Sequence, residues 1–265
     1  DLAAAGDIRL DNATSAIYTA GRIGVADTAL NGNNRWAVDG GGISMRAGGS
    51  VLGAAGVPDL WVTDWLRRLR QTAGDFVRDG YLTDWWSFRP RFQQGVATLA
   101  GGDIEVRAGA AVRDLILALP TSGRTSSAGG VRTVNVTGGG DLNLRAAGDV
   151  DGASFLIGRG IGQVLAGGAI GRSEAVQGYL MGYSSGAVPE QASLSLVAGN
   201  GAVLQSVDNP TFMGVNLGAG ATGPSFHPTN PASASPSSAA TTFFTYAANS
   251  AVGVLSKSGN TAVLG

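Results

Sequence analysis

The feature that most constrains the fold is a short pattern that recurs along the chain. A Gly-Gly or Gly-Asp step leads into an alternating apolar stretch, which is followed by Ala-Gly and one more apolar residue. Self-similarity of this kind is the signature of repeat architectures, in which each unit stacks on the next. Five copies are recognised, the last of them weaker: "AAGDIRL" at 4–10, "GGGISMRAGGSV" at 40–51, "AGGDIEVRAGAAV" at 100–112, "GGGDLNLRAAGDV" at 138–150 and "QASLSLVAGNGAV" at 191–203.

The apolar residues within each copy lie two positions apart, which predicts short strands with one buried face. Such strands cannot bury that face alone, whereas stacked copies can, so the pattern predicts an all-β fold built as a β-helix. The polar residues between them, such as Arg9 and Glu105, are expected to face water. The predicted core pairs are Ile8 and Leu10, Ile43 and Met45, Ile104 and Val106, Leu142 and Leu144, and Leu194 and Leu196.

The spacing of the copies is irregular. The first apolar residues of successive copies, from Ile8 to Leu194, are 35, 61, 38 and 52 positions apart. Intervals of this size fit one or two coils each, with insertions between them. The G-G-x-G-x-D motif of calcium-binding arrays does not recur, so no metal site is predicted.

One insertion, residues 57–95, departs from the strand rhythm and predicts a small α-helical subdomain. Pro58 and Asp59 suit the first turn of a helix, and the stretch that follows has helical spacing over about 58–72, with a short second helix near 74–79. The face of the first helix is formed by Leu60, Trp61, Trp65 and Leu69.

The insertion ends in "LTDWWSFRPRF", residues 82–92, the most aromatic stretch of the chain. Its aromatic side chains could stack on sugars or lipid headgroups, form a patch for another protein, or pack inward and clamp the insertion onto the β-helix. The inward interpretation is favoured, because an insertion needs such packing to hold it. The residues concerned are Trp85, Trp86, Phe88, Arg89, Arg91 and Phe92.

Catalytic chemistry finds little support in the sequence. The single histidine, His227, lies in a Pro-, Ser- and Ala-rich segment, and no nucleophile, phosphate-loop or zinc-protease motif is present. Asp141, Asp149 and Asp151 are the best acidic cluster for a glycosidase, which needs two carboxyl groups about 5–10 Å apart. Because Asp7 and Asp103 recur at the same turn position, a structural role is favoured for them. No catalytic residue and no cofactor are predicted.

The composition narrows the remaining functions. The 265 residues carry a formal net charge of −1, so the chain is too balanced for an obvious nucleic-acid binder. Seventeen of the 18 basic residues are arginines, a bias that fits the composition of the source proteome at least as well as phosphate binding. No cysteine is present, and no apolar stretch approaches a membrane span. The character of both ends suggests a piece of a longer chain.

The stretch from "WWSFRPRF" through "AGGDIEVRAGAAV" and the "GGGDLNLRAAGDVDGASFLIGRG" that follows resemble the C-terminal part of filamentous-haemagglutinin-family exoproteins of Gram-negative bacteria. The resemblance covers about residues 1–217 and is strongest over 81–172. It implies a right-handed parallel β-helix, export through an outer-membrane two-partner-secretion transporter, and a place on the cell surface or outside the cell. Such proteins serve as adhesins, biofilm scaffolds or stalks of toxin-delivery proteins.

We therefore expect a non-enzymatic, adhesive section of a bacterial fibre that contacts surface glycans or proteins and binds no nucleic acid. Two alternatives remain: a self-associating filament subunit and a carbohydrate-active β-helix enzyme. The expected organisation is β-helix at 1–56, the helical and aromatic insertion at 57–95, β-helix at 96–217, a linker at 218–242 and further strands at 243–265.

Overall fold

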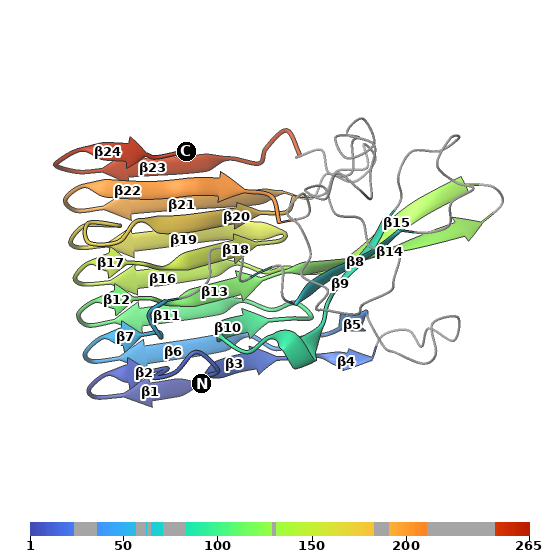
Figure 1. The fold of residues 1–265 in the computed structure, drawn as a ribbon, viewed down its shortest axis with the longest axis horizontal. Helices are drawn as coiled ribbons and strands as arrows, with labels where there is room; N and C mark the ends of the chain where they lie inside the picture. Colours follow the sequence, from blue (N-terminus) through green and yellow to red (C-terminus); the bar gives the residue numbers. More distant parts are fainter. Residues whose placement is uncertain are drawn as a thin grey trace.

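The computed structural model is almost entirely β-structure, with its strands stacked in successive levels from one end of the chain to the other (Figure 1). It describes residues 1–23, 36–56, 62, 65–70, 83–128, 131–182, 191–210 and 247–265. The linker expected at 218–242, with His227, and the short helix expected at 74–79 lie outside these residues. Within the described ranges, no helix has the length and apolar character that crossing a membrane requires.

The first sheet has seven strands, all paired in parallel. Its strands contain the alternating stretches of the repeat, and three of them share one pattern of burial in which the first, third and fifth residues are buried. In spatial order the strands are β1 (Leu2–Ala4), β6 (Ile43–Ala47), β11 (Ile104–Ala108), β16 (Leu142–Ala146), β19 (Gly160–Ala166), β21 (Ala192–Ala198) and β23 (Val252–Ser256).

Two further parallel sheets complete the stack. The second consists, in spatial order, of β24 (Thr261–Val263), β22 (Ala202–Asp208), β20 (Val176–Leu180), β18 (Ser154–Ile157), β13 (Ile116–Leu119), β10 (Gly95–Thr98) and β3 (Ala16–Thr19). The third, narrower sheet consists of β17 (Val150–Asp151), β12 (Val112–Arg113), β7 (Val51–Leu52) and β2 (Ile8–Arg9). Single bridges at Ile170 and Ala202 continue this third row of pairs.

The pairing places equivalent residues of successive levels directly beside one another. Ile104 lies between Ile43 and Leu142, and the inward residues of all three sheets form one continuous core. The ten predicted core residues are all buried: Ile8, Leu10, Ile43, Met45, Ile104, Val106, Leu142, Leu144, Leu194 and Leu196. The period-two pattern therefore places these strands with their apolar face inward.

The first copy of the repeat is aligned differently from the sequence-based prediction. Ile8 pairs with Val51 in the third sheet, whereas the partner of β6 in the first sheet is β1. Aligning the first copy by its Gly-Asp step was wrong. "AAGDI" at 4–8 corresponds to the Ala-Gly segment that follows the alternating stretch in the other copies. The preceding strand, only three residues long, carries no Gly-Gly signal of its own.

A further copy at 160–170, "GIGQVLAGGAI", was missed. Its strand β19 lies between β16 and β21, with Gly162 beside Leu142 and Leu194. A Cβ at Gly162 would lie 3.0 Å from the Cδ1 of Ile157 and 3.1 Å from that of Leu194, so neighbouring side chains occupy the space of the missing one. The glycine removes the apolar signal without leaving a gap in the core. Strand β19 also shows that one level can be as short as 20 residues, because Gly162 pairs with Leu142, 20 positions before it.

Three insertions form a lobe beside the stack, on the right of Figure 1, which we call the side lobe. It contains an antiparallel sheet of β15 (Val131–Gly138), β14 (Thr121–Ala128), β9 (Thr83–Ser87) and β8 (Leu66–Arg70), the pair β4 (Arg22–Ile23) and β5 (Ala37–Val38), and the 3₁₀ turn η4 (Arg89–Arg91).

The helix predicted over 58–72 is wrong where the structure describes it. Residues 66–70 form β8, which pairs with β9 from Leu66↔Ser87 to Arg70↔Thr83. Leu69 is therefore a strand residue rather than part of a helix face, and Leu60 and Trp61 lie outside the described residues. Helix propensity summed over five residues is a weak preference, and the hydrogen bonds offered by β9 override it.

Candidate binding surfaces

The side lobe is held against the stack by a second apolar core. Three central strands of the second sheet, β10, β13 and β18, are buried along their whole length because their inward residues enter the main core while the outward ones meet the lobe. The residues of this second core are Val62, Trp65, Leu66, Trp85, Phe92, Ala97, Leu99, Ile116, Ala118, Leu156, Tyr179 and Met181.

Trp85 is the largest fully buried side chain at this junction. Its indole Nε1 donates a hydrogen bond to the Oγ1 of Thr121 at 3.2 Å, and its ring lies against Gly123 of the neighbouring strand. A Cβ placed at Gly123 would lie 2.1 Å from two ring carbons, so only glycine leaves room for the indole. The tryptophan thus joins β9 to β14 through both a hydrogen bond and close packing.

Trp36 comes from a different insertion and meets the same strands. Its Nε1 donates to the carbonyl oxygen of Gly123 at 3.0 Å, and its ring lies 6.2 Å from that of Trp86. The guanidinium carbon of Arg124 lies 5.2 Å from the centre of the Trp36 ring, a cation–π distance. Trp36 and Trp86 are both buried. Segments from three separate places in the sequence are therefore joined by aromatic contacts.

Phe92 completes the junction at the stack. Its ring makes edge-on contacts with Trp65 at 5.4 Å and with Tyr18 of β3 at 5.9 Å. Phe92 and Trp65 are almost fully buried, and burial of aromatic side chains of this size stabilises by several kcal/mol at about 25 cal/mol per Å².

The exposed part of the aromatic stretch is small. Phe88 retains 40% of its surface, and Arg89 and Arg91 of the turn η4 are exposed. Neither arginine forms an ion pair with a described carboxylate. The stretch divides into a buried set that joins the lobe to the stack and one exposed aromatic side chain, which alone is a narrow platform for a ligand.

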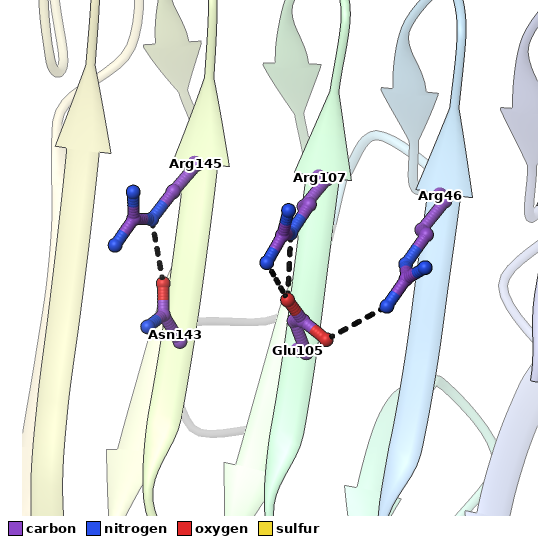
Figure 2. Close-up of polar contacts among 5 residues, drawn as sticks. All are labelled: Arg46, Glu105, Arg107, Asn143 and Arg145. Atoms are coloured by element: carbon purple, nitrogen blue, oxygen red, sulfur yellow. Dashed lines mark hydrogen bonds and ion pairs between the residues drawn. The ribbon is translucent and has the colours of Figure 1, made fainter.

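The outer face of the first sheet carries a second feature, a row of arginines. Arg46, Arg107 and Arg145 occupy the same position on three adjacent parallel strands, so their side chains are stacked at the strand spacing of about 4.8 Å (Figure 2). We call these three residues the arginine ladder. The residues two positions earlier on β11 and β16, Glu105 and Asn143, face the ladder.

Glu105 neutralises part of this charge. The Nε of Arg107 donates to one Glu105 oxygen at 2.6 Å, and Arg46 lies 3.4 Å from the other. The hydrogen bond from Arg107, and then the positive charges, hold the pKa of Glu105 below its ordinary value. Arg145 instead donates to the amide oxygen of Asn143 at 3.2 Å. One carboxylate faces three guanidinium groups, so the set has a net charge of +2.

A shallow groove of about 420 Å³ follows the arginine ladder. Its other wall consists of alanine and glycine residues at the ends of the three strands and at the corner after them. The lining residues are Arg46, Ala47, Arg107, Ala108, Gly109, Arg145, Ala146 and Ala147. The sequence carries this signal in the R of "SMRAG", "EVRAG" and "NLRAA", which follows the last residue of each core pair.

The acidic cluster considered for catalysis is divided between corners. Asp141 precedes β16 and Asp149 follows it, and a five-residue strand spans about 17 Å at 3.3 Å per residue. Each carboxylate accepts a backbone N–H of the following level: Asp141 from Ile161 at 2.8 Å, Asp149 from Ala169 at 2.7 Å and Asp151 from Ser173 at 3.0 Å. Asp141 is therefore too far from the other two for the paired arrangement of a glycosidase.

The recurring corner aspartates serve the same structural purpose elsewhere in the stack. Asp7 accepts the N–H of Ser50 at 2.7 Å, and Asp103 accepts that of Asp141 at 2.8 Å. The sequence predicted local turn hydrogen bonds, whereas the structure shows bonds from one level to the next.

The corner around Asp151 contains further carboxylates. Asp151 is buried, and both Asp114 and Glu174 border the small space over Gly152. Burial, and secondarily the negative charge of Asp151, raises the pKa of Asp114, while the charge of Arg113 opposes this shift. Among the described residues, no group of three or more histidine, cysteine, aspartate or glutamate side chains has the arrangement that a metal ion needs.

Comparison with known proteins adds no assignment to these surfaces. No family model matches the chain, and neither a curated protein nor a solved structure is significantly similar to it.

Proposed function

We propose that this chain is a section of a right-handed parallel β-helical rod of the filamentous-haemagglutinin type. Its role would be structural and adhesive rather than enzymatic, outside a bacterial cell. The observation that carries the proposal is the register of the three parallel sheets, in which equivalent residues stack through successive levels around one core. Rods of this kind keep their shape at any length, because each level contacts only its neighbours.

The partners would bind to the outer face of the first sheet and to the side lobe. The partners would be surface glycans or proteins of a host or of other bacteria. Export by a two-partner-secretion transporter rests on the resemblance in sequence alone. The carbohydrate-active enzyme is disfavoured because the corner aspartates already accept backbone hydrogen bonds and Asp141 stands apart from the others.

Adhesion is tested with beads that carry the folded 265-residue chain. We expect flow cells lined with bacterial or epithelial surfaces to retain these beads more strongly than beads that carry the heat-unfolded chain. Soluble products are measured in the same cells, and release of sugar reducing ends is expected to stay at background. Equal retention of both bead types would contradict the adhesive role. Glycan cleavage that is lost in Asp141→Ala or Asp149→Ala would show instead that the chain is an enzyme.

A further inference from the structure

We propose that the arginine ladder binds an acidic linear polysaccharide, specifically a chain of sugars that carry carboxylates, lying across strands β6, β11 and β16. The inference deepens the proposed function by naming a partner class, and it depends on that function only for the kind of surface that the chain meets. Three observations carry it: the register of the arginines, their incomplete neutralisation, and the groove beside them.

The register fixes a spacing. Arg107 is paired with Arg46 on one side and Arg145 on the other, so the three side chains leave the sheet from strands about 4.8 Å apart. Like charges directly opposite one another in a sheet are destabilising. A ligand that places negative charges between them removes this repulsion. A chain of such sugars that lies across the strands can present several carboxylates to the arginine ladder.

The positive charge of the arginine ladder is only partly neutralised by neighbouring carboxylates. Glu105 serves Arg46 and Arg107, whereas among the described residues no carboxylate lies within ion-pair distance of Arg145. The side chains of Arg46 and Arg107 are 61% and 58% exposed, so their remaining donors face solvent. A guanidinium group binds a carboxylate through two parallel hydrogen bonds, a geometry that the planar carboxylate of a uronate can accept.

The shape of the groove favours a sugar chain over a nucleic acid. Its lining contains only arginine, alanine and glycine, with no aromatic side chain on which a base could stack. The net charge of +2 is also small beside the phosphate contacts that sustain binding to nucleic acids. The small residues of the corner leave a shallow, open track that suits a flexible chain of rings.

The test measures binding of a short oligogalacturonate to the full 265-residue chain by calorimetry at low and at physiological salt. The methyl ester of the same oligosaccharide keeps the sugar rings and removes the charge, and a single-stranded oligodeoxynucleotide supplies phosphate charge instead. We expect binding to the free acid that weakens with salt, little binding to the ester, and weaker binding to the oligonucleotide.

Four variants locate the site. Arg107→Gln is expected to weaken binding about five-fold, and the double variant Arg107→Gln with Arg145→Gln about 25-fold, as for exposed ion pairs of up to about 1 kcal/mol each. Glu105→Gln is expected to strengthen binding, because it frees two arginines from their internal partner. The matched control is Arg113→Gln, which removes an exposed arginine from the third sheet. Circular dichroism verifies that every variant is folded.

The inference is overturned if the unmodified chain does not bind the free acid, if the ester binds equally well, or if Arg113→Gln weakens binding as much as Arg107→Gln. Stronger binding of the oligonucleotide would also overturn it, because the ladder would then act as a general site for phosphate chains. Retention of chain-coated beads together with failure to bind oligogalacturonate would leave the adhesive function standing and remove only this partner.

Discussion

At the scale of single residues, the corner aspartates show how the levels are held in line. Asp141 precedes its own strand, yet its carboxylate accepts the N–H of Ile161 in the next level. Hydrogen bonds of this kind to charged acceptors are stronger than those between neutral groups. Because the parallel ladders leave the corners outside the regular pairing, the aspartates satisfy backbone donors where the sheets cannot. The recurrence of this residue type at the corners is therefore explained by these backbone hydrogen bonds.

Asp114 differs from these aspartates, and its ionisation is expected to cost stability. Burial raises the pKa of its carboxyl, so the folded chain binds this proton more tightly than the unfolded chain does. The free energy of unfolding should therefore fall as the pH rises from the ordinary aspartate pKa, about 3.9, through the raised value. Asp114→Asn should remove this fall and increase the free energy of unfolding at neutral pH. It should give no gain below the ordinary aspartate pKa, where the carboxyl is protonated in both the folded and the unfolded chain. Asparagine also tolerates the positive φ of 53° at this position.

Urea unfolding of both proteins across this pH range measures the difference. Asp11→Asn serves as the control, since the exposed carboxylate of Asp11 pairs with Arg9 and its loss should not raise stability at neutral pH. A gain for Asp114→Asn that is the same at acidic and neutral pH would show that the effect arises from packing and not from ionisation.

At the scale of secondary-structure elements, the side lobe is the part of the fold that the sequence predicts least well. The strands of the first sheet follow from period-two patterns such as Ile104 and Val106, because one face of each is buried. The sequence of β8, "LRRLR", has its leucines three apart and predicts a helix, and only the partner strand β9 makes it extended. The hairpin β14–β15 was missed although the sequence has Gly-Gly between its two halves, a recognisable hairpin signal.

The candidate surfaces also differ in how far the sequence predicts them, because some depend on one segment and others on contacts between distant segments. The packing of "WWSFRPRF" against the stack follows from its composition, because so many aromatic side chains need burial. The contribution of Trp36 was not predictable, since it lies 49 positions before Trp85 and only the fold brings them to the same strands. The arginine ladder was visible in the three aligned copies, whose arginines hold the same position, and the pairing between strands shows that these positions are adjacent.

The lobe should depend on its buried aromatic side chains and not on its exposed one. Trp85→Ala is expected to destabilise the protein by about 3–5 kcal/mol, because it leaves a cavity and removes the hydrogen bond to Thr121. Phe88→Ala should change stability by about 0.5 kcal/mol or less, as is usual at exposed positions. Chemical denaturation gives both values, and hydrogen exchange should show opening of β9 and β14 first in the Trp85 variant. Equal losses in the two variants would contradict the clamp.

At the scale of the whole molecule, the stack ends in strands that have a partner on one side only within the described part of the chain. In the 265-residue chain, β23 and β24 are the last members of the first and second sheets. Val252 and Val263 occupy the positions of Leu194 and Leu204, which are buried one level earlier, yet they remain 42% and 60% exposed. Another level placed on them would bury these side chains and pair the free strand edges.

The isolated chain is therefore expected to associate as its concentration rises, by stacking one copy on another. Val263→Lys should reduce this association, because it places a charge where the two cores would meet. Asn260→Lys, at an exposed corner next to β24, is the matched control and should leave association unchanged. Sedimentation or light scattering at several concentrations measures the effect. A monomer at every concentration would rule out the self-associating filament and leave the rod intact.

The uneven lengths of the levels have a consequence for how such a molecule can vary. The shortest level needs 20 residues, and the side lobe is built from segments that leave the stack on one flank and rejoin it in register (Figure 1). Lengthening a loop costs little, about 0.6 kcal/mol for each doubling. New segments can therefore be spliced in at this flank while the pairing of the strands is preserved. The flank that carries the side lobe can therefore diversify in sequence and length. The outer face of the first sheet, with its row of arginines, must keep the spacing that the paired strands impose.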